Sequence, residues 1–179
     1  DALDRLQIQY GTSFGYPISA VGSHVSAVPN HQTGRITSLH TRGVVAMAGT
    51  FGYELNLGKL SEEEKEEIRS QVEEYRKFAP LIQTGLYYRL SDPSKEEYAA
   101  WAFVSEDQKE VLLNVVMQEI HGNMTVNYVN LQGLKCSAVY RDTETGKTYN
   151  GAALMEAGIP MPVEMGEFKA YQMHLTAEE

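Results

Sequence analysis

The chain has 179 residues, of which 42% are hydrophobic, a length that suffices for one ordinary domain or two small ones with a real core. Its formal net charge is −9 and its pI is near 5.1, so its long-range field repels DNA, RNA and anionic lipid. These values, with no apolar run long enough for a transmembrane helix, exclude nucleic acid and membrane as expected partners.

The first 60 residues alternate between helical and strand-like segments. Apolar residues from Leu3 to Tyr10 recur at spacings of three and four, which predicts a helix. Short apolar segments at 21–28 and 50–55 predict strands, and residues 38–48 between them predict a second helix.

The clearest predicted element is an amphipathic helix over residues 61–83. Ser61 and Glu64 form a capping box at its start, and Gly85 is a stop signal after its end. Its apolar residues recur at helical spacing, namely Ile68, Val72, Tyr75, Ala79 and Ile82. The order helix, strand, helix, strand, helix is typical of the tail of an α/β repeat, either a barrel or a doubly wound sheet.

After Gly85 the hydrophobic period becomes two. Short runs rich in Val, Tyr and Phe predict strands at 98–105, 111–118, 125–131, 138–141 and 168–175. Turn signals separate them, among them Asn150-Gly151. The pattern predicts an antiparallel β-sandwich whose single core holds Trp101, Phe103, Leu113, Val115 and Tyr128.

A serine motif near the first helix is the first candidate for chemistry. Gly11-Thr12-Ser13-Phe14-Gly15 matches the G-x-S-x-G nucleophile elbow of α/β-hydrolase esterases. A helical pattern precedes this motif, whereas the elbow requires a strand, and Pro17 follows closely. We interpret the motif as a helix-ending loop, and a catalytic Ser13 stays the rival hypothesis.

A polar segment after the first predicted strand is the better candidate site. The five histidines never occur at the spacing of a metal site, so no metal is predicted. His24, Asn30, His31, Gln32 and Arg35 form a dense set of imidazole, amide and guanidinium groups. Such groups suit the hydroxyls of a sugar, and equally a loop that bonds its own backbone. We take these five as candidate substrate-pocket residues.

Three long segments carry a family resemblance. They read DALDRLQIQYGTS at 1–13, GSHVSAVPNHQTGR at 22–35 and GTFGYEL at 49–55. In order and spacing they resemble bacterial α-galactosidases of glycoside hydrolase family 36. Looser matches extend the resemblance over essentially the whole chain.

The resemblance implies a fold. Members of the family have an N-terminal β-sandwich domain, a central (β/α)8 barrel and a C-terminal β-sandwich. Residues 1–84 would be the last part of the barrel, with strand seven at 23–28 and strand eight at 51–55, and residues 85–179 the C-terminal sandwich. Because active sites of such barrels lie at the C-terminal ends of the strands, we expect the polar loop at 29–35 on the catalytic face.

The resemblance also implies an activity. Family members hydrolyse terminal α-D-galactosides such as melibiose or raffinose with retention, using an aspartate nucleophile and an aspartate acid/base. By the family pattern both lie upstream, and Asp1 is the last aspartate of a Ser-Asp-x-Thr-Asp segment and a helix-start residue. We therefore expect no catalytic residue in this chain, and no activity of the chain alone. The alternatives are α-N-acetylgalactosaminidase activity of the parent and a non-catalytic carbohydrate-binding sandwich.

Partners and location follow from the resemblance and from composition. The resemblance implies α-galactoside oligosaccharides as ligands, no cofactor, and a homo-oligomer, a tetramer, for the full-length parent. The single cysteine, Cys136, rules out an internal disulfide and suits a reducing compartment. The first residues lack the features of a signal peptide. We expect a cytoplasmic protein.

Overall fold

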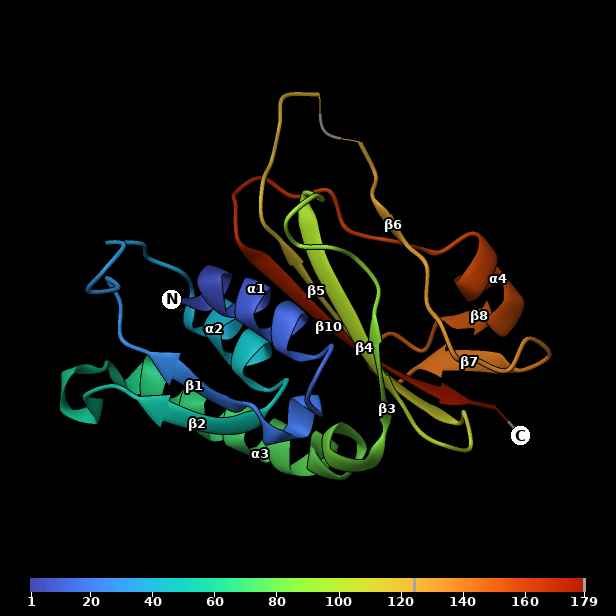
Figure 1. Ribbon diagram of the computed structural model, residues 1–179, viewed down its shortest axis with the longest axis horizontal. Coiled ribbons are helices and arrows are strands. Elements are labelled where there is room, and N and C mark those ends of the chain that lie inside the picture. Colours follow the sequence, from blue (N-terminus) through green and yellow to red (C-terminus); the bar gives the residue numbers. More distant parts are fainter. Residues whose placement is uncertain (124, 179) are drawn as a thin grey trace. The chain divides into compact units, whose positions relative to one another are not determined.

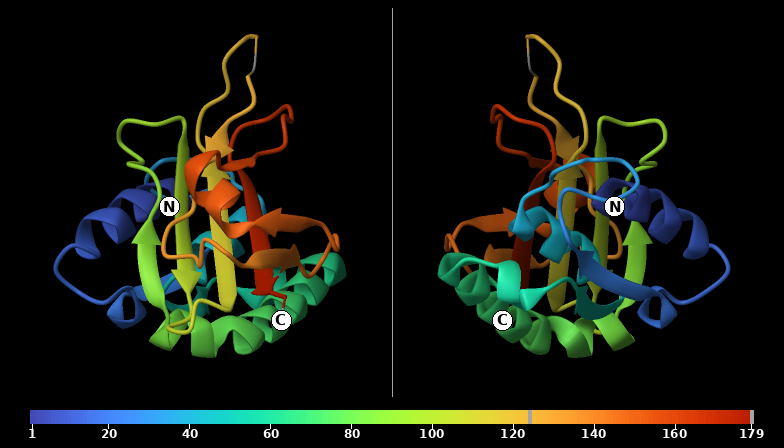
Figure 2. Two further views of the ribbon diagram at one scale, coloured as in Figure 1. Left: turned by 90° about the vertical axis from the view of Figure 1, so that its right-hand side faces the viewer. Right: turned by 90° about the vertical axis from the view of Figure 1, so that its left-hand side faces the viewer.

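The computed structural model describes residues 1–123 and 125–178 and divides the chain into two compact units. Unit 1 is Asp1–Gln83 and unit 2 is Thr84–Glu179. Figures 1 and 2 show both as ribbons. Within the described residues, no helix has the length and apolar character needed to cross a membrane.

Unit 1 is built on two parallel strands joined through a helix (Figure 1). The strands pair in register from Gly22 opposite Thr50 to Ser26 opposite Glu54. The predicted order helix, strand, helix, strand, helix is confirmed. The elements are α1 (Ala2–Thr12), η1 (Ile18–Ala20), β1 (Gly22–Ser26), α2 (Leu39–Ala46), β2 (Thr50–Glu54), η2 (Leu57–Lys59) and α3 (Glu62–Thr84).

Side-chain caps explain where the helices of unit 1 begin. The carboxylate of Asp1 accepts a hydrogen bond from a main-chain N–H of the first turn of α1, and the hydroxyl of Ser38 does the same for α2. At α3 the predicted capping box is present. The N–H of Glu64 donates to the hydroxyl of Ser61 at 3.2 Å, and the N–H of Ser61 donates to the carboxylate of Glu64 at 2.9 Å.

One glutamine connects α3 to the rest of unit 1. Gln71 is only 4% exposed, and its amide donates to the carbonyl of Leu39 at 3.1 Å while accepting from the hydroxyl of Tyr53 at 2.7 Å. Its side chain lies against Gly43, where an added Cβ would come within 2.5 Å of it. Around these bonds Val25, Leu39 and Ala46 form a buried apolar cluster, which Phe51, Tyr53, Leu55 and Ile68 complete.

Unit 2 is an antiparallel sandwich of a long sheet and a short one. The six-stranded sheet has the order β3-β4-β5-β10-β7-β8, and the two-stranded sheet pairs β6 with β9. The fold class is thus α/β followed by all-β, as predicted. The elements are β3 (Leu86–Arg89), β4 (Tyr98–Val104), β5 (Glu110–Met117), β6 (Tyr128–Val129), β7 (Val139–Asp142), β8 (Thr148–Asn150), α4 (Gly151–Glu156), β9 (Ile159–Pro160) and β10 (Lys169–Ala177).

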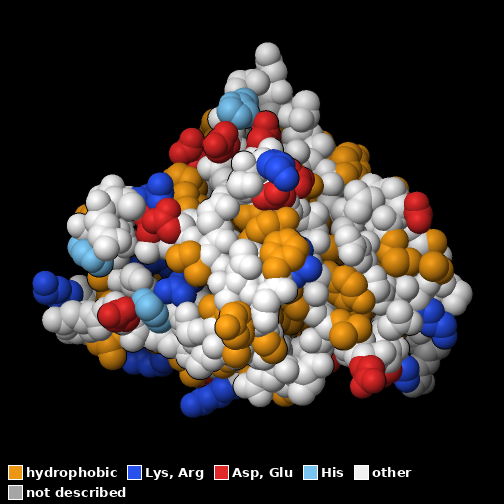
Figure 3. Space-filling view, in the orientation of Figure 1, with side chains coloured by type: hydrophobic (Ala, Val, Ile, Leu, Met, Phe, Trp, Pro, Cys, Tyr) orange, Lys and Arg blue, Asp and Glu red, His pale blue; other side chains and the backbone are white. Residues whose placement is uncertain are grey.

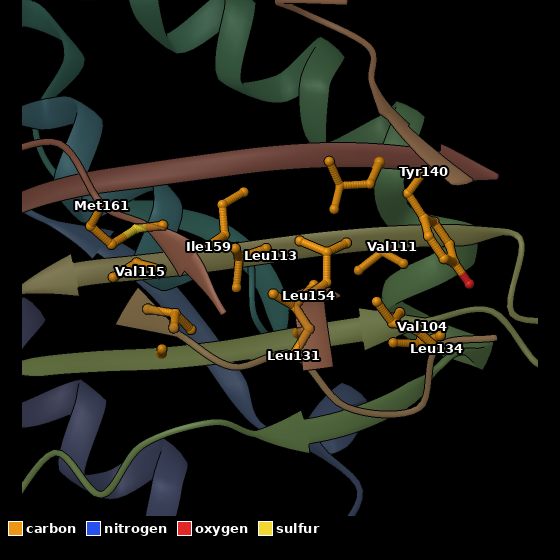
Figure 4. Packing of buried hydrophobic residues seen from close by; sticks show 14 of the residues in the cluster. Val104, Val111, Leu113, Val115, Leu131, Leu134, Tyr140, Leu154, Ile159 and Met161 are labelled. Carbon is orange, nitrogen blue, oxygen red and sulfur yellow. The ribbon is translucent and has the colours of Figure 1, made fainter. Parts of the chain in front are cut away.

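The core of unit 2 differs from the one predicted. Leu113 and Val115 do belong to it, together with residues of β6, β7, β9 and α4 (Figure 4). Trp101 and Phe103 are buried, but they lie on the other face of the sheet, because the register places Ala102 opposite Leu113 and neighbouring residues alternate between faces. Tyr128 is 54% exposed, so its predicted burial is wrong.

Two predicted local features of unit 2 are also corrected. The strand expected over 125–131 is confined to Tyr128–Val129. Asn150-Gly151 is not a hairpin turn, because the side chain of Asn150 accepts from the N–H groups of Ala152 and Ala153 and starts α4. Asparagine suits both roles by the same chemistry, so the local pattern does not separate them.

Candidate functional site

A small pocket lies at the C-terminal end of β1, within unit 1. Residues from the start of α1, from β1, from the loop at 27–37 and from α2 line it: Asp1, Ala2, Arg5, His24, Ser26, Ala27, Val28, Asn30, Arg35, Thr37 and Arg42. Its free volume is about 10 Å³, measured as the space open to the centre of a water molecule. This is room for one water and far too little for a hexose. This pocket by itself therefore cannot enclose a sugar.

His24 lies between a cation and a carboxylate. Its Nε2 is 2.6 Å from Oε2 of Glu54, and Nη2 of Arg5 lies 3.3–3.4 Å from the imidazole nitrogens. Arg5 also donates to the carbonyl of Gly22 at 3.0 Å, which fixes α1 against the start of β1. Burial lowers the pKa of Arg5, and the Glu54 carboxylate acts in the opposite direction. His24 also lines the pocket.

Asn30 shapes the loop rather than presenting its amide. It is 7% exposed, and its Oδ1 accepts from the N–H groups of Gln32 at 3.0 Å and Thr33 at 3.1 Å. Its main chain closes the loop, with N–H donating to Arg35 and the carbonyl accepting from Gly34. For Asn30 the structure therefore shows the loop bonding its own backbone.

Arg35 ties this loop to the start of α1. Its Nη1 is 2.6 Å from Oδ1 of Asp1, and the hydroxyl of Thr33 donates to Oδ2 of Asp1 at 2.7 Å. The Asp1 side chain is 4% exposed, and its Oδ1 also accepts from the N–H of Leu3 at 2.9 Å. All of these bonds stabilise the ionised carboxylate. Asp1 is thus an anchor for the loop as well as a helix cap.

Arg42 closes the base of the pocket. It is 6% exposed, and its guanidinium donates to the carbonyls of Ser26 at 2.6 Å, Thr37 at 3.2 Å and Ser38 at 3.3 Å. Burial lowers the pKa of Arg42, while the more distant carboxylates of Glu64 and Glu67 raise it. The side chain joins the end of β1 to the start of α2.

The structure brings together three of the five candidate residues. His24, Asn30 and Arg35 line the pocket, whereas His31 and Gln32 are exposed and do not line it. The sequence interpretation missed Asp1, Arg5 and Arg42 as pocket residues. A signal existed for Arg42, since it is the one Lys, Arg, Asp or Glu residue in the helical run at 39–48, and a charged residue that becomes buried needs a partner.

Ser13 has a structural role in unit 1. It is the C-cap of α1, and its hydroxyl donates to the carbonyl of Tyr10 at 2.7 Å. A helix leads into the motif, so the strand-to-helix turn of a nucleophile elbow is missing. Across residues 1–123 and 125–178, no group of three or more His, Cys, Asp or Glu side chains is arranged to hold a metal ion.

Unit 2 contains a larger cavity, whose free volume by the same measure is about 120 Å³. It lies beside the loop that follows β5, where acidic side chains and a histidine gather at the top of Figure 3. Its lining includes the carboxylates of Glu97, Glu119 and Glu164, and the ring of Tyr171. Burial raises the pKa of Tyr171, and the Glu164 carboxylate raises it further.

Two family models match the chain in succession. The melibiase model matches residues 1–85, and the model of the glycosyl hydrolase family 36 C-terminal domain matches residues 98–175. Unit 1 and unit 2 thus correspond to consecutive parts of one type of protein.

Curated relatives match along nearly the whole chain. The bifunctional α-galactosidase/sucrose kinase AgaSK of Mediterraneibacter gnavus is 58% identical over 98% of this chain and 19% of its own length. The α-galactosidase AgaA of Geobacillus stearothermophilus is 46% identical over 99% of this chain and 24% of its own length. The chain therefore spans about a fifth to a quarter of the length of these relatives.

Solved structures agree with these matches. The galactosidase domain of AgaSK has a TM-score of 0.98 at 57% identity, and AgaA a TM-score of 0.96 at 46% identity. In both cases the match includes 99% of this chain and 25% of the solved chain. Variants of AgaA have been solved in complex with raffinose and with stachyose. On these matches, the chain belongs to glycoside hydrolase family 36.

Proposed function

We propose that this chain is the C-terminal part of a longer retaining α-galactosidase that releases terminal α-D-galactose from oligosaccharides such as melibiose and raffinose. One observation carries the proposal: α-galactosidases are 41–58% identical to it over at least 98% of its length. The raffinose and stachyose complexes of two AgaA variants support the class of substrate.

In this proposal, residues 1–84 form the end of a (β/α)8 barrel and residues 85–179 its C-terminal domain. The parallel pair β1 and β2 supports the first assignment, because barrel strands are parallel. His24 in β1, and Asn30 and Arg35 in the loop that follows it, then form one wall of the sugar site. His31 and Gln32, on the exposed part of the loop, are proposed to face the more distant part of an oligosaccharide.

The catalytic pair is proposed to lie on the preceding part of the longer protein. One aspartate carboxylate attacks the anomeric carbon while a second, about 5 Å away, protonates the departing glycosidic oxygen. Water then displaces the first aspartate, losing its proton to the second. Asp1 does not suit the proton-donor role, since its carboxylate already accepts hydrogen bonds from Arg35, Thr33 and Leu3. This chain supplies part of the wall that orients the sugar.

Assays on the full-length protein test this function. Turnover of an aryl α-galactoside and of melibiose is expected, with the α-anomer of galactose formed first when the reaction is followed by proton NMR. An aryl α-N-acetylgalactosaminide is the matched comparison, because it differs only at C2. Preference for that substrate would replace the proposal by its nearest alternative, and turnover of neither would refute both.

A carbohydrate-binding function of unit 2 is the second candidate. The cavity beside Tyr171 favours it, because an aromatic ring and carboxylates together can bind a sugar face and its hydroxyls. This candidate predicts measurable binding of galactose or melibiose to the isolated chain by titration calorimetry. Our proposal predicts none, since the pocket of unit 1 has no room for a hexose.

We further propose that the full-length protein is a cytoplasmic homo-oligomer, a tetramer. The family resemblance supports the assembly, and the single cysteine is compatible with a reducing compartment. Light scattering of the full-length protein would measure the number of subunits, and fractionation of cells would test the location.

A further inference from the structure

Arg42 joins the two ends of one loop. Its Nη1 donates to the carbonyl of Ser26, the last residue of β1, and its Nε donates to the carbonyls of Thr37 and Ser38, which lead into α2. The loop between, residues 27–37, carries Asn30 and Arg35. One guanidinium group therefore fixes both where the loop leaves the strand and where it enters the helix.

The shape of the guanidinium group, not only its charge, is what this arrangement requires. Arg42 is 6% exposed, and its hydrogen bonds go to main-chain carbonyls on both sides of the loop. A planar fork of N–H donors can reach several acceptors at once, whereas a lysine offers a single compact ammonium on a flexible stem. Lysine would keep the charge and lose the bridge.

A charged pair that reaches beyond the loop also holds it at a second place. Near its far end, Arg35 and Thr33 contact the carboxylate of Asp1. In the same loop, His31, Gln32, Thr33 and Gly34 are exposed. With its base released, the loop would pivot about the Asp1 contact, and His24 and Arg35 would no longer face the pocket together.

We propose that Arg42 is a positioning residue that sets the geometry of the sugar-site wall by clasping both ends of the loop at 27–37. It acts through the loop, without touching the substrate. The effect on sugar binding rests on the proposed α-galactosidase function, whereas the effect on the loop does not.

Kinetics of the full-length protein provide the first test, with Arg42→Lys, Arg42→Met and Val45→Ala compared. Val45 is fully buried on the same helix, so Val45→Ala lowers stability without releasing the loop. Both Arg42 variants are expected to raise KM for an aryl α-galactoside at least tenfold, with a smaller change in kcat. Val45→Ala is expected to leave KM unchanged. Wild-type KM in Arg42→Lys would overturn the proposal.

Limited trypsin digestion provides a second test that needs no activity. Release of the loop should accelerate cleavage after Arg35 at least tenfold in Arg42→Lys and Arg42→Met, as followed by mass spectrometry. Cleavage after Arg69 on α3 reports general unfolding and should rise no more than in Val45→Ala. Equal acceleration of cleavage after Arg35 and Arg69, or no acceleration after Arg35, would refute the proposed role of Arg42. If the wild type does not hydrolyse α-galactosides, this test still decides the loop's dependence on Arg42.

Discussion

The carboxylate of Asp1 and the guanidinium of Arg35 form a 2.6 Å ion pair that connects the start of α1 to the pocket loop. The pair is asymmetric in exposure, with the Asp1 side chain 4% and the Arg35 side chain 32% accessible. A carboxylate so nearly buried has lost the water that solvates it in the unfolded chain, and hydrogen bonds from its partners must replace that water. Loss of the Asp1–Arg35 ion pair should therefore lower the stability of the fold as well as loosen the loop.

Removing Arg35 tests the importance of this pair. In the full-length protein, Arg35→Met should destabilise the fold by about 2 kcal/mol, because it leaves a buried carboxylate short of one charged partner. The apparent midpoint of thermal unfolding measures the effect. Arg69→Met is the control, since the pair of Arg69 with Glu66 is exposed on both sides and contributes at most about 0.5 kcal/mol. Equal shifts would show that the Asp1 pair is no more than a surface contact.

The contact between Gly43 and Gln71 predicts a pairwise effect. Gly43→Ala places a Cβ within 2.5 Å of the Gln71 side chain and should cost about 1–3 kcal/mol. Gln71→Ala should cost about 2 kcal/mol, because the hydroxyl of Tyr53 and the carbonyl of Leu39 lose a buried partner. Glu73→Ala, on the exposed face of α3, is the control for helix propensity.

The double variant decides whether these two residues interact. With the long Gln71 side chain removed, the added methyl group of Gly43→Ala has room, so the double variant should be less destabilised than the sum of the single variants. Thermal midpoints of the four proteins complete the cycle. Strict additivity would mean that Gly43 is needed for another reason.

The two units should behave differently when separated. Residues 85–179 are expected to fold alone, since β3, β4, β5, β10, β7 and β8 form one continuous antiparallel sheet with its own apolar cluster. Residues 1–84 contain only two paired strands, so both edges of that parallel sheet lack a neighbour within the unit. Hydrogen exchange on the whole chain should be slow in β4, β5 and β10 and fast in β1 and β2. Equal protection of both sets would contradict this.

A pH titration tests the turn that begins at Asp92. Hydrogen bonds from the Ser94 hydroxyl and from Lys95 lower the pKa of Asp92 to about 2. Because this folded-state pKa lies below the value of about 3.9 in an unfolded chain, the contribution to stability is present above pH 4 and is lost as the pH falls through 2. Ser94→Ala should raise the pKa of Asp92, as measured by carboxyl NMR on residues 85–179.

Asp107 is the internal control for that titration. Its pKa is lowered by the hydroxyl of Ser105 in a separate turn and should not change in Ser94→Ala. A shift of both carboxyl groups would indicate a general change of fold, and a shift of neither would show that Ser94 does not determine the ionisation of Asp92.

The chain by itself should have no hydrolytic activity. Without a nucleophile and a proton donor, neither the covalent intermediate nor protonation of the leaving group is available. Purified residues 1–179 should therefore leave an aryl α-galactoside intact under conditions in which the full-length protein consumes it. A serine-directed phosphonate should likewise leave Ser13 unlabelled. Turnover by the chain would show that a catalytic pair lies within it.

The sequence by itself determined the features that depend on neighbours in the chain. The capping box of Ser61 and Glu64, the helix from Leu3 to Tyr10 and the order of elements through residue 84 all follow from spacings of a few residues. The family likewise follows from residues 1–13, 22–35 and 49–55, because long ordered matches are specific. Each of these signals is local and needs no knowledge of the fold.

Tertiary structure alone decided the pocket and the faces of the sheet. Arg5, His24, Arg42 and Glu54 come from four elements, and Asp1 caps the first of them. Only the folded chain brings Asp1 and Arg42 to the loop at 27–37, and Arg5 and Glu54 to His24. Alternation in β4 and β5 predicted which residues share a face within a strand. Which partner covers each face depends on the register between strands, so Trp101 and Leu113 were placed in one core although they lie on opposite faces. Asn150 shows the same limit, since asparagine suits a helix cap and a turn alike, and only the folded chain shows that the residues after it continue as α4.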